Sequence, residues 1–132
     1  MKYMILTFGS QADYAEMASW TPDDFAKMTE FMQKFSEELV ASGELVDTRG
    51  LAGPVHTRRV RLQGGVPVVT DGPYAEAEEV LAGYWIVECE SFDRATEIAA
   101  RLAQCPTPGG VFEEKGYADI RPIIEHADEI DL

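Results

Sequence analysis

The sequence predicts an α+β fold built on a mainly antiparallel sheet. Strand-like and helix-like segments follow one another as strand, helix, strands, strand, helix and strand, which is a split β-α-β pattern with an inserted hairpin. The chain has 132 residues, of which 45% are apolar, and this is enough for one domain with one ordinary core. We therefore expect a single domain over residues 1–123 and an acidic tail over 124–132.

The first strand and the first helix have clear signals. Residues 2–8, KYMILTF, are apolar on both faces, which predicts a central strand that is covered on both sides. A helix is expected over 21–43, with Thr21 as its cap, Pro22 in its first turn and Gly43 as its stop. Apolar side chains recur along it at steps of three and four: Phe25, Met28, Met32, Phe35 and Leu39. We expect this stripe to face the core, and a binding groove is the alternative.

The middle of the chain reads as a strand and then a hairpin. The segment 44–51, ELVDTRGL, is the strand. The hairpin is expected to run from HTRRVRL at 56–62 to VPVVT at 66–70, with Gly64 and Gly65 forming its turn.

A long strand, a second helix and a closing strand complete the pattern. Residues 81–90, LAGYWIVECE, are the strand, and Ser91 can cap the helix that follows over 91–105. One side of this helix is apolar and is expected in the core: Ala95, Ile98, Ala99 and Leu102. The segment 118–124, ADIRPII, is expected to close the sheet.

Both faces of the predicted sheet carry bulky apolar side chains. They come from the first strand and from the strand after the hairpin: Met4, Ile5, Leu6, Phe8, Tyr84, Trp85, Ile86 and Val87. Two helices can cover only one face, so the other face would be a large exposed apolar patch. We infer that a second copy of the chain covers it in a two-fold homodimer.

Composition limits the classes of partner. The formal net charge is −13, with 24 acidic and 11 basic residues, so neither nucleic acid nor a membrane is expected as a partner. The apolar runs are too short for a membrane-spanning helix or a signal peptide. Cys89 and Cys105 are too few and too far apart for a disulfide framework, so we expect reduced thiols in a cytoplasmic protein.

Asp71, Gly72 and Pro73 form a turn signal directly before the long apolar strand. As a structural element, the Asp71 side chain would bond its own downstream backbone while Gly72 and Pro73 shape the turn. As a functional element, a carboxylate beside Tyr84 and Trp85 would be partly desolvated, which raises its pKa and suits proton transfer. The two interpretations are compatible.

The neighbouring acids allow a metal hypothesis. Glu76 and Glu79 would share a face if the segment made a helical turn, and they could then share a proton or hold a divalent cation. A solvated acidic loop explains them as well. The chain has no GxSxG, HExxH, P-loop or GxGxxG motif, and its His and Cys residues lack zinc spacing, so we expect no cofactor and no metal site.

A short basic cluster begins at His56. On a strand, Arg59 and Arg61 would project from one face, and His56 and Arg58 from the other. This arrangement could hold an anion near Asp71, with His56 as a proton carrier. Ion pairs with the surplus Asp and Glu residues are the alternative.

The motifs TDGPYAEAEE, LAGYWIVECESFDRATEIAARLAQCP and IRPI together resemble the YCII-related, or DGPF-domain, family. MKYMILTFG and GLAGPVHTRRVRL also match, so the resemblance covers nearly all of 1–123. It implies a ferredoxin-like fold that pairs into a dimeric α+β barrel, and it implies no established reaction. The sequence departs from the family pattern at Tyr74, where Phe is usual, and at Ala77 and Glu78, where Thr and Lys are usual.

The resemblance also implies a site. Related proteins have been suggested to be enzymes because a histidine and an aspartate meet in a pocket, and Asp71 would be the acid here. From the residues themselves, His56 is a weaker catalytic candidate, and the candidate ligand-binding residues are Gly72, Pro73, Tyr74, Glu76, Arg59 and Trp85. Family members are often encoded beside extracytoplasmic-function sigma factors. One alternative is therefore a non-catalytic module that binds a small molecule or a regulatory protein. Another is a dimer that serves only as a scaffold.

Overall fold

A computed structural model describes residues 1–72, 78–108 and 116–130. Its strands are β1 (Lys2–Gly9), β2 (Leu45–Gly50), β3 (Arg58–Gln63), β4 (Val66–Asp71), β5 (Val80–Glu88) and β6 (Ala118–Pro122). Its α-helices are α1 (Gln11–Glu16), α2 (Pro22–Ala41) and α3 (Phe92–Leu102), and short 3-10 turns cover Met17–Ser19, Pro54–His56 and Ala127–Glu129. The α+β prediction is confirmed.

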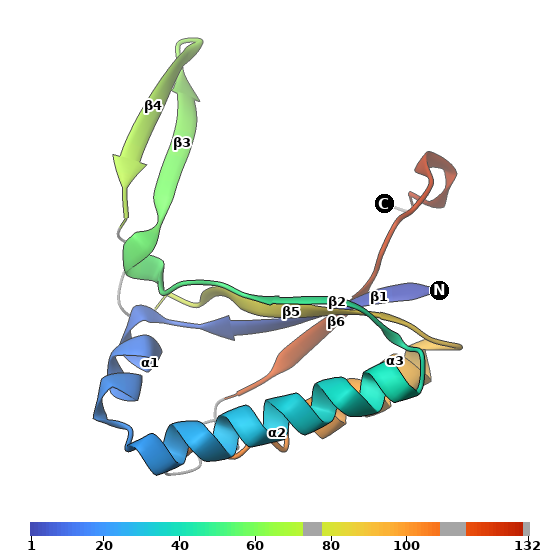
Figure 1. Cartoon of the computed structure of the whole chain (residues 1–132). Helices are drawn as coiled ribbons and strands as arrows, with labels where there is room; N and C mark the ends of the chain where they lie inside the picture. Colours follow the sequence, from blue (N-terminus) through green and yellow to red (C-terminus); the bar gives the residue numbers. More distant parts are fainter. Residues whose placement is uncertain (73–77, 109–115, 131–132) are drawn as a thin grey trace.

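The main sheet has four strands in the order β2-β5-β1-β6, and all its pairs are antiparallel. The sheet of this single chain is open, with β2 and β6 as its edges. In the centre, Ile5 of β1 lies opposite Trp85 of β5 and Ile120 of β6. Helices α2 and α3 pack against one face of this sheet (Figure 1).

The core lies between these two helices and the sheet. Ile5, Phe35 and Val87 are its largest fully buried side chains. The ring of Phe35 meets that of Trp85 edge-on, with centroids 4.8 Å apart. Burial of the predicted apolar side of α3 is confirmed at Ala95, Ile98, Ala99 and Leu102.

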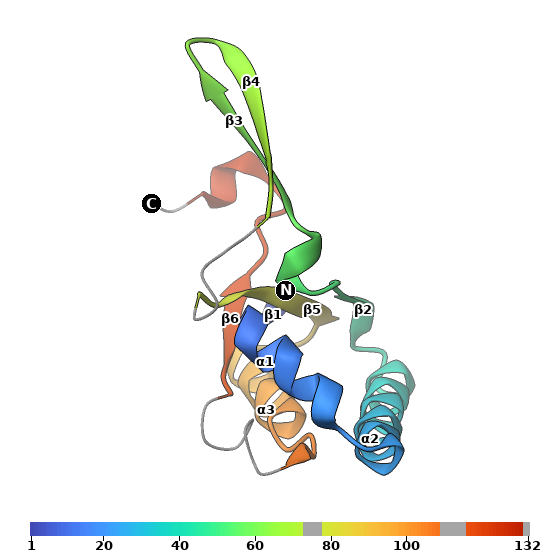
Figure 2. The ribbon, with the colours of Figure 1, turned by 90° about the vertical axis from the view of Figure 1, so that its left-hand side faces the viewer.

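The opposite face of the sheet, which we call the open face, carries the alternate residues of β1 and β5. Met4 lies opposite Ile86 and Leu6 opposite Tyr84, and all four are half-buried. β3–β4 and the C-terminal segment both rise on this side of the sheet, away from the helices (Figures 1 and 2). The prediction of apolar bulk on both faces is confirmed.

The hairpin β3–β4 forms a separate two-stranded sheet. Its turn is made by Gly64 and Gly65, whose φ angles of 58° and 80° lie in the left-handed region that glycine tolerates. All residues of both strands are exposed. This hairpin projects from the body of the chain (Figure 2).

Two local features differ from the sequence analysis. Residues 11–16 form the helix α1, which the sequence analysis does not predict; Ser10 and Asp13 cap it reciprocally through bonds of 3.1 and 2.8 Å. His56 belongs to a 3-10 turn that begins at Pro54, so it does not share a strand face with Arg58. Proline starts such a turn readily because its fixed φ is already helical.

The predicted stripe of α2 is core-facing along its second half only. Phe35 and Leu39 are buried, whereas Phe25 is 37% exposed and packs on Trp20 with centroids 5.1 Å apart. Phe31, absent from the predicted stripe, packs against the core. None of the helices in the described ranges is long and apolar enough to cross a membrane.

Candidate functional site

The root of the hairpin brings together two parts of the chain that the sequence analysis singled out. The amide of Gly72 donates to the carbonyl oxygen of Thr57 at 2.6 Å. A Cβ at position 72 would lie 3.5 Å from the carbonyl oxygen of Val55, so only ordinary contact separates the two segments. The Asp71–Gly72 end of β4 is therefore held directly beside the turn that contains His56.

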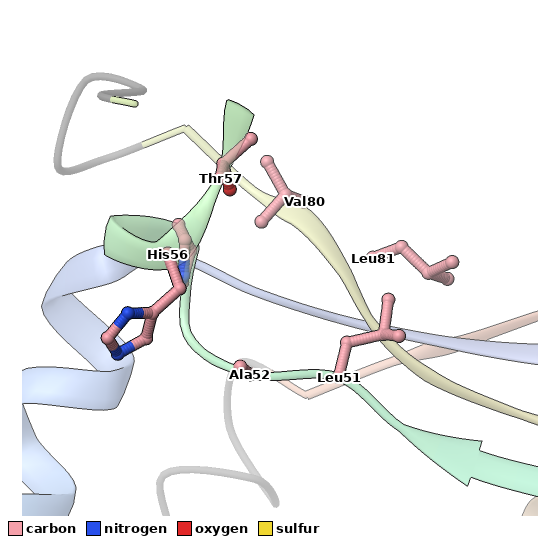
Figure 3. A pocket seen from close by; sticks show the side chains of 7 residues that line it. Leu51, Ala52, His56, Thr57, Val80 and Leu81 are labelled. Atoms are coloured by element: carbon pink, nitrogen blue, oxygen red, sulfur yellow. The ribbon is translucent and has the colours of Figure 1, made fainter. Parts of the chain in front are cut away.

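A pocket of about 370 Å³ opens at this root. It is lined by Leu51, Ala52, Pro54, His56, Thr57, Val80 and Leu81. Figure 3 shows the aliphatic side chains of Leu51, Val80 and Leu81 together, while the His56 ring is directed away from them, toward the opposite side. The pocket is thus aliphatic at Leu51, Val80 and Leu81, and Thr57 adds a hydroxyl to its lining, while the His56 ring points away.

Asp71 is an ion-paired, solvated carboxylate in the single chain. Its Oδ1 accepts a hydrogen bond from Nε of Arg58 at 3.1 Å, and the two side chains are 85% and 71% exposed. The pair lies across the strands, because Arg58 and Asp71 are directly opposite in the hairpin register. A role in proton transfer would need a further surface that covers this carboxylate.

The remaining candidates are dispersed. Arg59 lies opposite Thr70, on the other face of the hairpin from Arg58. Trp85 is buried in the core against Phe35, and it helps to hold the helices on the sheet. The candidates Pro73, Tyr74 and Glu76 lie outside the described residues.

Six lining residues were missed by the sequence analysis: Leu51, Ala52, Pro54, Thr57, Val80 and Leu81. Four of them directly follow β2 or begin β5, and these two strands are neighbours only in the folded sheet. In the sequence, these four residues are marked only by apolar side chains on either side of the turn-rich segment between β2 and β5, which is a weak signal.

A second polar cluster lies at the start of β5. The hydroxyl of Tyr117 donates a short hydrogen bond to Glu79, and the Tyr117 ring stacks on Phe8 with centroids 5.5 Å apart. The bond to Glu79 raises the pKa of Tyr117. Among the described residues, no three His, Cys, Asp or Glu side chains converge to hold a metal ion.

The cysteines are unsuited to nucleophilic chemistry. Cys89 and Cys105 are both buried and free. Burial raises the pKa of each thiol, which keeps it protonated and weakly nucleophilic.

Comparisons with known proteins match nearly the whole chain. The family model of the YCII-related domain matches residues 1–121. An uncharacterized protein of Rhizobium meliloti (strain 1021) is 25% identical over 122 residues, covering 92% of this chain and 96% of that protein. Neither match names a reaction.

Proposed function

The chain belongs to the YCII-related domain family, and we propose that it is a cytoplasmic homodimer that binds a small molecule in the pocket at the root of β3–β4. One observation carries the proposal. A concave, largely aliphatic space lies beside polar groups at the junction of two sheets, and such sites are where small ligands bind.

The dimer follows from the open face. Met4, Leu6, Tyr84 and Ile86 leave an apolar surface on one side of the sheet, and a second copy would bury it. The sheet order β2-β5-β1-β6 with two helices on one face supports a ferredoxin-like domain over 1–123, with 124–132 as a tail. Two such sheets with their open faces together would make a dimeric α+β barrel.

The lining favours a small amphipathic anion. Its aliphatic side would accept a short hydrocarbon or ring, and the Thr57 hydroxyl can bond a polar group. Arg58 and Arg59 follow Thr57 directly and begin a hairpin that is the basic part of an otherwise acidic chain.

The test is an amide NMR titration of the intact protein with hexanoate and, separately, with neutral hexanamide. We expect millimolar hexanoate to shift amides of residues 51–57 and 80–81, and hexanamide to shift them less. In Ala52→Trp we expect the indole to fill the pocket and the shifts to be lost, whereas Ala41→Trp, at another exposed alanine at the end of α2, keeps them. The absence of localised shifts with both compounds, or the same shifts in Ala52→Trp, would refute the ligand pocket.

Acid–base catalysis at Asp71 is the second candidate function. It is favoured by the bond between Gly72 and Thr57, which places the predicted acid beside the turn of the predicted His56 partner. Carboxyl footprinting with a carbodiimide and glycine ethyl ester tests it, with Asp23 as the reference because its side chain is also ion-paired and 74% exposed. Asp71 labelled much more slowly than Asp23 supports a covered acid; equal labelling rules it out.

The same labelling result bears on the alternative of a protein-interaction module. If Asp71 is freely labelled and hexanoate does not bind, the exposed hairpin would serve contact with another protein, such as a stress-response regulator.

A further inference from the structure

The hairpin β3–β4 is too exposed to be explained by the single chain. Each of its strands has six residues, and every one of them is exposed. An isolated two-stranded hairpin is only marginally stable in water. Large aliphatic side chains are nevertheless exposed along it: Val60 (63%), Leu62 (74%), Val66 (62%), Val68 (37%) and Val69 (55%).

The cross-strand register separates the two faces of the hairpin. On one face Val60 lies opposite Val69 and Leu62 opposite Pro67. We call these four residues the apolar face. The Arg58–Asp71 pair lies on the same face, at its root, because residues two apart on a strand point to the same side.

The other face of the hairpin is basic and mixed in polarity. It carries Arg59 opposite Thr70, Arg61 opposite Val68 and Gln63 opposite Val66. Any surface that covers the apolar face would therefore also cover the root at Asp71, while leaving these arginines near the border of the contact.

We propose that β3–β4 is an arm that extends to the second copy of this chain and packs its apolar face on that copy. The surface of the second copy then completes the site at Asp71. The inference rests on the proposed homodimer. It goes further because it assigns the contact to one face of the hairpin and makes the partner's surface a wall of the site.

The length of the arm indicates that a second copy of the chain covers its apolar face. A strand of six residues spans about 20 Å, whereas two sheets packed face to face lie only about 10 Å apart. The arm rises from the open side of the sheet and away from it (Figure 1). In a dimer with the open faces together, it must therefore extend alongside the partner.

Charge complementarity agrees with this choice. Residues 58–71 hold three arginines and one aspartate, in a chain whose formal net charge is −13. The arm is thus the basic part of an acidic molecule. A second copy presents it with an acidic body, and the same contact occurs twice about a two-fold axis.

Sedimentation equilibrium of two adjacent variants tests the arm. Leu62→Lys places a charge on the apolar face, and Gln63→Lys places the same charge on the opposite face at the same height. Burial of one large aliphatic side chain corresponds to roughly a 10- to 100-fold change in affinity. We expect Leu62→Lys to raise the dimer dissociation constant by that factor and Gln63→Lys by less than about threefold.

Amide hydrogen exchange provides a second readout that needs no variant. We expect residues 58–72 to become more protected as the wild-type concentration is raised through the dimer dissociation constant, while the fully buried Ile5 and Val87 serve as internal references.

The outcomes separate the two proposals. A wild-type protein that stays monomeric at micromolar concentration overturns both the dimer and the arm. A dimer that both variants leave intact, or weaken equally, or that gives no concentration-dependent protection of 58–72, overturns the arm and leaves the dimer standing.

Discussion

The ion pair between Glu44 and Arg94 makes a quantitative prediction about stability. Arg94, in the first turn of α3, donates from Nε to one Glu44 oxygen at 2.9 Å and from Nη2 to the other at 2.8 Å. Glu44 directly precedes β2, so this two-bond contact ties α3 to the edge of the sheet. The perturbations are Glu44→Gln, Arg94→Gln and the double variant.

The expected magnitude follows from the exposure of the two side chains, which is 14% for Glu44 and 35% for Arg94. Exposed pairs couple by about 0.2–1 kcal/mol, and breaking a buried pair costs about 3–5 kcal/mol. The geometry is bidentate and the burial is intermediate, so we expect a coupling free energy of about 1–2 kcal/mol. At about 4 °C per kcal/mol, loss of this coupling alone corresponds to a fall in Tm of roughly 4–8 °C.

The pair also predicts a pH dependence. Hydrogen bonds from Arg94 lower the pKa of Glu44 below its ordinary value of 4.5, and Glu44 in turn raises the pKa of Arg94. A carboxyl whose folded-state pKa is lowered stabilises the fold fully above its unfolded-state pKa and loses this effect as pH falls through the folded-state pKa. The difference in the free energy of unfolding between wild type and Glu44→Gln should be constant near neutral pH and should disappear below about pH 4.5.

Urea denaturation followed by the fluorescence of the buried Trp85, at one fixed protein concentration, provides the measurement. Glu97→Gln is the matched control: Glu97 also accepts from Arg94, at 3.1 Å, but it is 68% exposed and should change stability by less than about 1 kcal/mol. A coupling free energy below about 0.3 kcal/mol would refute the reasoning, and so would a stability difference between wild type and Glu44→Gln that persists unchanged in acid.

Three further predictions concern the backbone and the thiols. Gly83→Ala places a Cβ 2.8 Å from the carbonyl oxygen of Arg49 and should cost about 1–3 kcal/mol in urea denaturation; unchanged stability would contradict the close strand contact. Gly65→Ala puts a side chain at a φ of 80° and should cost the hairpin about 1–2 kcal/mol, seen as faster amide exchange within β3–β4 and not elsewhere. Cys89 and Cys105 should react with Ellman's reagent at neutral pH only as the chain unfolds, and rapid labelling of the native protein would show that burial does not protect them.

Most of the fold was predictable because its signals are local. Thr21 and Ser91 cap their helices by accepting from backbone amides three residues ahead, as their positions in the sequence indicate. Two adjacent glycines specified the hairpin turn. Helix α1 was missed because it has only six residues and no buried side chain, so its apolar pattern is too short to detect.

The site was less predictable because its geometry is made by tertiary contacts. The sequence located Asp71 and Gly72 at a turn and His56 near a strand, but only the folded chain joins them through Thr57. From the sequence, Trp85 could line a ligand pocket or lie in the core. Strand alternation alone does not say which face of the sheet the helices cover. The angle at which the hairpin leaves the sheet has no sequence signal at all.

The sheet order has a consequence for how the chain acquires its structure. β1 precedes β5 and β6 in the chain, yet these two strands are its neighbours in the sheet. Lys2 can pair only after Glu88 has been synthesised, and Tyr3 can pair with Pro122 only later still. Among the described strands, only β3 and β4 are neighbours joined by a tight turn. These pairings between strands far apart in the sequence predict slow folding, because β1 has no partner strand until β5 has been synthesised.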